Sequence, residues 1–517
     1  MMAHSLDVLE SLRAGEEMVL APRTAIEIPH HGALQGFGVH FAPFRAGDAW
    51  RLRVRDSPVG LMSYAPSQAF EINGIALGIT SPGDELVEFD PVDRRGFIRV
   101  TAAREGVLRA RVPGMPYAAP EWASALWLGG SWNGLTEQTV LEDLRVQVSH
   151  RVELPVRLID FGWQSEEELL AFHSERFPHA AEMLASLHDA GVRVVVWWAP
   201  WIDAATPLWK RMEAEGWLLG AARGEALRMH VVGDGEVVGS YIDVTNAACQ
   251  EYMRERIHAL QELGIDGVRL DFGEALTDEI VFAGEVLPES LLRERVAISR
   301  NSYIVAVQSL IRTSLQETDP EALVVSRAGW TQSPGESGLW LGDQSSDVSR
   351  YSGLKSAVHG AKTAFEAGYC CVGLDIGGYW DEPTMETYGW WHEIASAMPY
   401  ATYHGFGRRA PWAYGREGLD AYAACARIRK DIHSTGVYGP LRIVLGRTGE
   451  NMLIRQAATP SWIVPLPIGQ SIAVDLPPGS WQDTATGAGF EGPVRIPRTP
   501  EEGMTVYVRD DAPTTSC

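Results

Sequence analysis

Two aspartates, each at the end of a short apolar run, are the residues of this chain whose types and positions best suit chemistry. Asp271 ends the run GVRLD at residues 267–271, and Asp343 ends the run WLGD at 340–343. A buried parallel strand that runs into a functional loop has this pattern. Two strand-end carboxylates in one barrel-sized chain favour paired-carboxylate chemistry, of which glycoside hydrolysis is a common example. The structural alternative for Asp271 is that it caps the next helix.

The elements that would position these aspartates lie in residues 119–415, where apolar strands alternate with helical patterns, as in a parallel α/β fold. The predicted strands are Ala125–Leu128, Val156–Phe161, Val192–Trp198, Gly267–Asp271, Ala322–Arg327, Leu339–Leu341, Cys371–Asp375 and Ala401–Tyr403. The predicted helices are Ala180–Ala190, Ala247–Leu263, Glu289–Glu317, Gly353–Ala367 and Thr384–Met398. Eight strands over this length predict a (β/α)₈ TIM barrel.

Segments rich in β patterns flank this barrel on both sides. Residues 1–118 contain short alternating runs broken by Gly, Pro and Asp, which predict an N-terminal β-sandwich domain. Residues 416–517 begin with a predicted helix, Leu419–His433, and then return to short β runs, which predict a C-terminal β domain, also of the sandwich type. Between the third and fourth barrel strands, Asp-Gly within Val231–Val238 predicts an inserted hairpin.

The composition is that of a soluble globular protein, with 45% hydrophobic and 21% charged residues. The formal net charge of −23 argues against nucleic acid and anionic membrane as partners, because both need a basic surface. We expect no secretory leader and no membrane span, and the five cysteines form no CxxC pair. These features predict a cytoplasmic protein, and a homo-oligomer is possible.

Motifs that bind common cofactors are not found. The chain has no Walker loop, no GxGxxG after the first strand and no HExxH, so we expect no cofactor. His404 is the one histidine at a predicted strand end, whereas metal sites in barrels usually need more. Because carboxylates gather at the predicted strand ends, a metal-dependent barrel enzyme stays an alternative.

The functional residues of a (β/α)₈ barrel lie at the C-terminal ends of its strands. The residues at or after those ends are mainly carboxylates and indoles, namely Trp127, Asp160, Trp163, Trp198, Trp201, Asp271, Glu274, Arg327, Trp330, Trp340, Asp343, Asp375 and His404. Carboxylates accept hydrogen bonds from sugar diols, and indoles stack on the apolar face of a sugar ring. The set predicts a monosaccharide pocket, although most of the 18 tryptophans should be core residues. The structural alternatives are a helix cap for Asp375 and a core histidine for His404.

Five motifs in this region resemble, in the right order, the catalytic barrel of glycoside hydrolase family 31, the α-glucosidase and α-xylosidase family. They are FP at 177–178 with LHDAG at 187–191, IDVTN at 242–246, LDFGE at 270–274, Arg327 with WLGDQ at 340–344, and LDIGGY at 374–379. Ala247 replaces the proline that the family usually has after the TN pair. The resemblance covers nearly the whole predicted barrel, and it implies a small carbohydrate substrate.

Site roles follow from the resemblance by position. It implies that Asp271 is the nucleophile and Asp343 the general acid/base. The implied substrate-binding residues are Asp160, Trp163, Trp198, Glu274, Arg327, Trp340, Asp375 and His404, with Glu274 better suited to holding Asp271 than to catalysis. The implied reaction is retaining, exo-acting hydrolysis of a terminal α-linked monosaccharide through a covalent glycosyl-aspartate. It requires carboxyl groups roughly 5–5.5 Å apart, and we expect a raised pKa for Asp343.

Departures from the family pattern leave the substrate open. Thr402 stands where the family usually has an arginine, two residues before the histidine, which puts a glucose substrate in doubt. The DFGE and WxGDQ spellings are similar to the α-xylosidase and sulfoquinovosidase branches, and Arg157 or Gln164 could bind a sulfonate. The sequence does not decide between glucose, xylose, galactose, N-acetylgalactosamine and sulfoquinovose. A transglycosylase and a non-catalytic sugar-binding protein also remain alternatives.

Overall fold

The computed structural model describes the barrel region almost completely and its flanks in part. The described ranges are 116–130, 133–221, 226–230, 238–272, 300–329, 333–349, 352–434, 461–466 and 471–510, together with individual strands within 18–110, 281–286 and 441–456. The structural statements below concern these residues.

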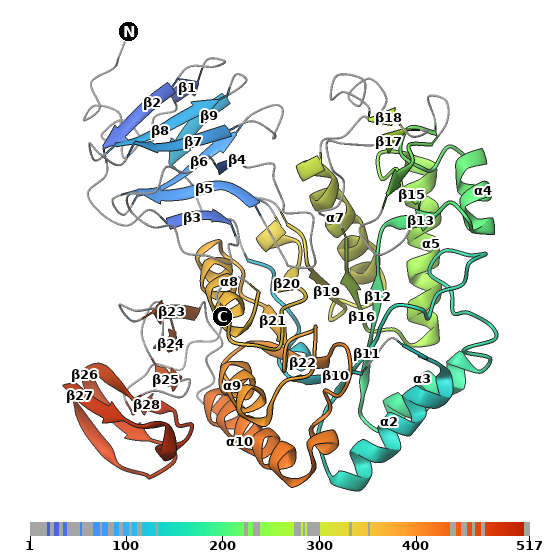
Figure 1. Cartoon of the computed structure of the whole chain (residues 1–517). Coiled ribbons are helices and arrows are strands. Elements are labelled where there is room, and N and C mark those ends of the chain that lie inside the picture. The colour runs from blue at the N-terminus through green and yellow to red at the C-terminus, as the bar shows by residue number, and fades with distance from the viewer. Residues whose placement is uncertain are drawn as a thin grey trace.

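Eight parallel strands of the described region form a closed barrel (Figure 1). In their order around the barrel they are β10 (Leu126–Gly130), β11 (Val156–Ile159), β12 (Arg193–Trp198), β16 (Gly267–Leu270), β19 (Leu323–Ser326), β20 (Gly338–Trp340), β21 (Val372–Asp375) and β22 (Tyr400–His404). β22 pairs with β10 and closes the barrel. The predicted (β/α)₈ fold is therefore confirmed, and each predicted strand ends within two residues of the observed one.

Helices cover the outside of the barrel (Figure 1). They are α2 (Glu137–His150), α3 (Ala180–Asp189), α4 (Pro207–Ala214), α5 (Ala247–Leu263), α7 (Arg300–Thr318), α8 (Leu354–Glu366), α9 (Met385–Ala395) and α10 (Gly415–Ser434). The part of the predicted helix Glu289–Glu317 before Arg300 lies outside the described residues. Two of these helices, α2 and α4, were not predicted from the sequence. Helix α2 escaped prediction because it buries little more than Val140 and Gln147, so the apolar periodicity of its sequence is weak.

Alternation along each strand decides which side chains enter the barrel. On β12, Val194, Val196 and Trp198 point outwards and pack in one core cluster with residues of α3 and α5. Val195 and Trp197 point inwards and share a different cluster, which includes Trp127 and Tyr400. At the C-terminal end of the barrel, the inward positions are therefore the ones that can meet a ligand.

An insertion follows β12, as predicted. β13 (Trp201–Asp203), β14 (Met229–His230) and β15 (Val238–Tyr241) form a small antiparallel sheet in which β14 and β15 pair directly. The predicted Asp-Gly turn of this hairpin lies outside the described residues. A short pair of strands, β17 (Val281–Phe282) and β18 (Glu285–Val286), follows β16 in the chain.

The flanking segments form antiparallel sheets. The described N-terminal strands are β1 (Met18–Leu20), β2 (Ala25–Pro29), β3 (Gln35–Gly38), β4 (Leu52–Arg53), β5 (Pro66–Ile72), β6 (Ile75–Thr80), β7 (Val87–Val92), β8 (Phe97–Ala102) and β9 (Gly106–Ala110). They pair as two sheets, β1-β9-β6-β5-β3 and β2-β8-β7-β4.

The C-terminal strands form one sheet in the order β23-β24-β25-β28-β26-β27. Their bounds are β23 (Leu441–Leu445), β24 (Met452–Gln456), β25 (Trp462–Leu466), β26 (Ile472–Asp483), β27 (Gly489–Arg498) and β28 (Tyr507–Arg509). Trp462 and Val464 of β25 pack in the same core cluster as residues of α8, α9 and α10. The C-terminal sheet therefore shares a core with the β20–β22 side of the barrel (Figure 1).

Candidate active site

Asp271 lies directly after β16 and is held by two hydrogen-bond donors and one ion pair at the C-terminal end of the barrel. Its Oδ2 accepts a hydrogen bond from Trp197 Nε1 at 2.8 Å, and its Oδ1 accepts one from Phe272 N at 2.7 Å. The same Oδ1 lies 3.0 Å from Nε of Arg327. Phe272 has a left-handed φ of +56°, a conformation that costs a non-glycine residue about 1–2 kcal/mol, and its carbonyl accepts from the Tyr241 hydroxyl. This backbone turn aims the Asp271 carboxylate at its donors.

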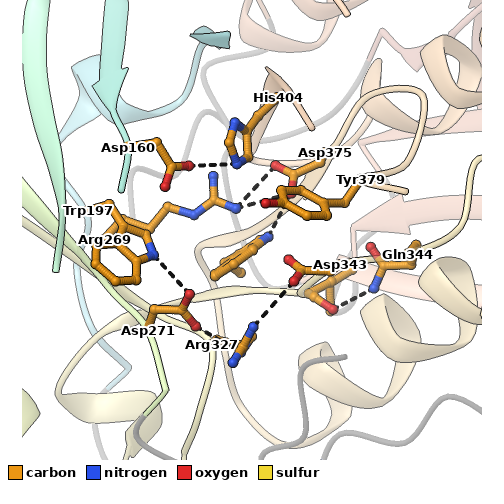
Figure 2. Close-up of polar contacts among 12 residues, drawn as sticks. Asp160, Trp197, Arg269, Asp271, Arg327, Asp343, Gln344, Asp375, Tyr379 and His404 are labelled. Carbon is orange, nitrogen blue, oxygen red and sulfur yellow. Dashed lines mark hydrogen bonds and ion pairs between the residues drawn. The ribbon is translucent and has the colours of Figure 1, made fainter. Parts of the chain in front are cut away.

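Asp343 follows β20 and lies on the other side of the same arginine (Figure 2). Its Oδ2 lies 3.5 Å from Arg327 Nη1, whereas its buried Oδ1 has no hydrogen-bond partner among the described residues. Burial raises the pKa of Asp343 well above its usual value. Arg327 opposes this rise, and the negative charges of Asp271 and Asp375 add to it. The direction of this pKa agrees with the expected one, and Asp343 is suited to keep its proton to a higher pH than an ordinary aspartate.

Arg327, at the end of β19, lies between two aromatic rings as well as between two carboxylates. Its Cζ is 4.7 Å from the centre of the Phe272 ring and 5.4 Å from that of Trp340. A guanidinium at these distances gains from the ring faces and is fixed in orientation. One rigid cation therefore sets the relative positions of Asp271 and Asp343.

A third carboxylate, Asp160, pairs with the histidine that ends the barrel. His404 Nε2 lies 2.6 Å from Oδ2 of Asp160, and its Nδ1 lies 2.9 Å from the carbonyl oxygen of Gly130. Burial alone would raise the pKa of Asp160, but the charge and hydrogen bond of His404 and the charge of Arg269 outweigh it, so the pKa is lowered. Asp160 is thus held as a carboxylate that can accept hydrogen bonds.

The fourth carboxylate, Asp375, pairs with an arginine from the opposite part of the barrel. Arg269 Nη2 lies 3.2 Å and 3.1 Å from the two oxygens of Asp375, and both side chains are completely buried. Trp340 Nε1 donates to Asp375 Oδ2 at 3.1 Å, and its ring centre is 3.5 Å from Arg269 Cζ. Figure 2 shows this guanidinium between Asp160 and Asp375. Thr402, which stands where the family usually has an arginine, is paired with Asp375 in strand register. The cation that faces Asp375 is instead Arg269 of β16.

Comparison with known proteins identifies this barrel. The model of the family 31 glycosyl hydrolase TIM-barrel domain matches residues 116–432, which is more than half of the chain. The chain belongs to glycoside hydrolase family 31. Among similar family proteins are the α-xylosidase XylQ of Lactiplantibacillus pentosus, 25% identical over 58% of this chain, and the sulfoquinovosidase of Agrobacterium fabrum, 29% identical over 47%. These matches cover 39% and 35% of the relatives' own lengths, so the chain spans well under two thirds of either.

A solved structure supports the same architecture. The family 31 α-xylosidase from a soil metagenome, complexed with xylose, has a TM-score of 0.75 at 18% identity, covering 95% of this chain and 80% of that one. At this identity the likeness shows the fold.

The family 31 barrel brings most of the predicted site residues together at one end. Asp160, Asp271, Arg327, Trp340, Asp343, Asp375 and His404 all have contacts within the group just described. Glu274 and Trp330 lie outside the described residues. The structure does not bring Trp163 and Trp198 to the group, because both point outwards into the core between barrel and helices. Trp127 points into the barrel at a deeper level, where it stacks on Tyr400.

Two residues of the site were missed by the sequence reasoning, which named neither Trp197 nor Arg269 as a site residue. Trp197 contacts Asp271, and the alternation that places Val195 and Trp197 on one face of β12 could have indicated it in place of Trp198. Arg269 lies two residues before Asp271 and so shares its inward face. An arginine at an inward position of an apolar strand was the available signal.

Arg157, considered above for sulfonate binding, faces away from this group. It lies on the outer face of β11, and its Nη1 is 2.7 Å from Oδ2 of Asp143 on α2. Gln164 forms an isolated bridge with Phe172. Neither contact belongs to the site described above.

The described residues show neither a metal site nor a membrane helix. They contain no group of three or more His, Cys, Asp and Glu side chains arranged to hold a metal ion. None of their helices has both the length and the apolar composition to cross a membrane.

Proposed function

We propose that this protein is a retaining, exo-acting α-glycosidase that releases a terminal monosaccharide. The observation that carries the proposal is the shared contact of Arg327 with Asp271 and Asp343. Asp271 has several donors, as a carboxylate nucleophile should, whereas burial favours the protonated form of Asp343. Two neighbouring carboxyl groups in different protonation states are what a retaining glycosidase requires.

In the proposed first step, Asp271 attacks the anomeric carbon of the bound sugar while the proton of Asp343 moves to the leaving oxygen. The bond to the aglycone breaks, and a covalent glycosyl-aspartate forms. Water then attacks the anomeric carbon, Asp343 takes up its proton, and Asp271 is released. The paired carboxylates Asp160 and Asp375 would accept hydrogen bonds from the sugar hydroxyls, because each is held by its own cation.

For the sugar itself, we propose an uncharged glycone and would test xylose first. The α-xylosidases among the relatives support this choice. The outward contact of Arg157 with Asp143 counts against one of the observations behind the sulfoquinovose hypothesis, which also rested on Gln164 and on the DFGE and WxGDQ motifs.

The decisive experiment is hydrolysis of a panel of 4-nitrophenyl α-glycosides by the wild type and by Asp271→Ala. The panel comprises the glucoside, xyloside, galactoside, N-acetylgalactosaminide and sulfoquinovoside. Release of nitrophenol from one sugar by the wild type alone would establish the activity and its glycone. Chromatography of the products at high substrate concentration would separate hydrolysis from transglycosylation, and activity after chelation would test the metal-dependent alternative. A wild type that cleaves no member of the panel would contradict the proposal for these glycones and favour a sugar-binding role.

A further inference from the structure

A buried arginine outside the group of paired carboxylates connects three of the loops at the barrel end. Arg409 follows β22 and is 2% exposed. Among the described residues, its hydrogen bonds go to backbone carbonyls and to the hydroxyl groups of Ser346 and Tyr414, and no carboxylate pairs with it. Burial lowers the pKa of this guanidinium. A cation that is buried among carbonyls has a large desolvation cost, so its position indicates a specific task.

The first loop that Arg409 contacts is the one after β21. Its Nε donates to the carbonyl of Gly378 at 2.7 Å, and its Nη2 donates to that of Tyr379 at 2.9 Å. The same Nη2 also donates to the carbonyl of Asp381. One planar guanidinium therefore fixes three carbonyls of residues 378–381.

The second loop is the one after β20, which carries Asp343. The backbone amides of Tyr379 and Trp380 donate to the carbonyl of Gln344 at 2.6 Å and 3.0 Å. The amide of Ser346 donates back to the carbonyl of Trp380 at 3.1 Å, and Arg409 Nη2 lies 3.4 Å from Oγ of Ser346. Gln344 directly follows Asp343 in the chain, so the loop after β21 is bonded to the residue next to Asp343.

The backbones of these loops approach each other so closely that neither can shift towards the other without a clash. Gly378 has a φ of +72°, and a Cβ there would lie 2.7 Å from the carbonyl oxygen of Ser345. The third loop follows β22 and carries Arg409 itself. Its Gly405 has a φ of +143°, and a Cβ there would lie 2.8 Å from Nε of Arg409. The three backbones are thus packed around the guanidinium.

We propose that Arg409 is a positioning residue that sets the orientation of Asp343 through the loop after β21. This inference rests on the proposed function, since it assigns Arg409 to the acid/base half of that reaction. Arg409 holds residues 378–381, these residues hold the Gln344 carbonyl, and the Gln344 backbone fixes Asp343. An arginine is required because its donors form a rigid planar fork, whereas a lysine has one nitrogen and cannot span the same carbonyls.

The test compares Arg409→Lys with a control variant at the neighbouring arginine, Arg408→Lys. Arg408 is exposed, with its side chain paired to Glu382, and contacts no catalytic carboxyl. Rates are measured on two substrates with the same glycone. The leaving oxygen of a methyl α-glycoside needs protonation by Asp343. From a 2,4-dinitrophenyl α-glycoside, the leaving group departs as the stable phenolate almost without protonation.

We expect Arg409→Lys to lower kcat/KM about 30- to 100-fold on the methyl glycoside and less than about threefold on the dinitrophenyl glycoside, because misplacing the acid removes most of its contribution. Arg408→Lys should leave both rates near those of the wild type. Equal losses on the two substrates, or the same selective loss in Arg408→Lys, would overturn the inference.

A second measurement does not depend on activity. Amide hydrogen exchange of the peptides covering 343–349 and 376–382 should be faster in Arg409→Lys than in both the wild type and Arg408→Lys, while α5 stays unchanged as an internal standard. Unchanged exchange in these peptides would overturn the proposed connection. If exchange is faster in Arg409→Lys but the wild type cleaves no glycoside, the connection between the loops holds and the proposed function fails.

Discussion

The carboxylates at the barrel end form two halves that differ in how their charges are balanced. In the half that we propose to bind the sugar (the binding half), Asp160 faces His404 and Asp375 faces Arg269, so each carboxylate has a partner of its own. In the reacting half, Asp271 and Asp343 share Arg327 among the described residues. The difference shows how one barrel end can shift the pKa of the same residue type in opposite directions. The charge and hydrogen bond of His404 outweigh burial and lower the pKa of Asp160, whereas burial and the charges of Asp271 and Asp375 outweigh Arg327 and raise the pKa of Asp343.

The largest expected effect comes from removing the charge of the reacting half. Asp271→Ala should lower kcat on the preferred glycoside by on the order of 10⁴-fold or more, because no covalent intermediate can form.

Asp343→Ala should lower hydrolysis of an alkyl glycoside strongly but spare the first step on an activated aryl glycoside. Burst kinetics on the aryl substrate measure this difference. Equal losses on aryl and alkyl glycosides in Asp343→Ala would show that Asp343 is not the acid.

The binding half should respond with a loss of stability as well as of affinity. Arg269→Met leaves Asp375 buried without its cation and should cost about 3–5 kcal/mol in the free energy of unfolding. The added change Asp375→Asn removes the unpaired charge, so the double variant should be more stable than Arg269→Met alone. Denaturant titration followed by tryptophan fluorescence measures both. Additive losses in the double variant would show that the two residues do not act as a pair.

The shared cation predicts a shift in the pH dependence of the reaction. Arg327 lowers the pKa of Asp343, so Arg327→Met should raise that pKa. Because activity requires protonated Asp343, it falls as pH rises through this pKa, and the alkaline limb of kcat/KM should move to higher pH in Arg327→Met. The remaining activity of the variant is followed from pH 5 to 10. A limb that stays in place, or that moves to lower pH, would contradict the assigned contact.

The smallest effect concerns the stability of the folded chain. A carboxyl whose pKa is raised by folding contributes stability that is present at low pH and is lost as pH rises through the folded pKa. Asp343→Asn cannot ionise, so its melting temperature should exceed that of the wild type at alkaline pH, by about 1 °C for each kcal/mol relieved in a chain of this size. At pH 4 the two proteins should melt together. A stabilisation of the same size at both pH values would have to come from another source.

The fold and the ends of its strands were predictable because they depend on local patterns. Apolar runs that end in a carboxylate marked Asp271, Asp343 and Asp375, and the observed strands place all three at the barrel end. Trp198 was predicted in place of Trp197 because two adjacent indoles end β12, and only the phase of the strand decides which one points inwards.

The pairing of charges could not be predicted in the same way. Arg269 and Asp375 are far apart in the chain and meet only across the closed barrel, so no spacing rule connects them. Arg409 likewise acts through carbonyl groups, which every residue has and which no sequence motif marks.

The contact between His404 and Gly130 has a consequence for how the chain is made. It joins residues that are 274 positions apart, and β22 is the last of the barrel strands in the chain. Because synthesis proceeds from the N-terminus, Asp160 can pair with His404 only after nearly all of the barrel has left the ribosome. The pair Asp160–His404 therefore forms last, and a nascent or truncated barrel lacks it even when Asp271 and Asp343 have already been made.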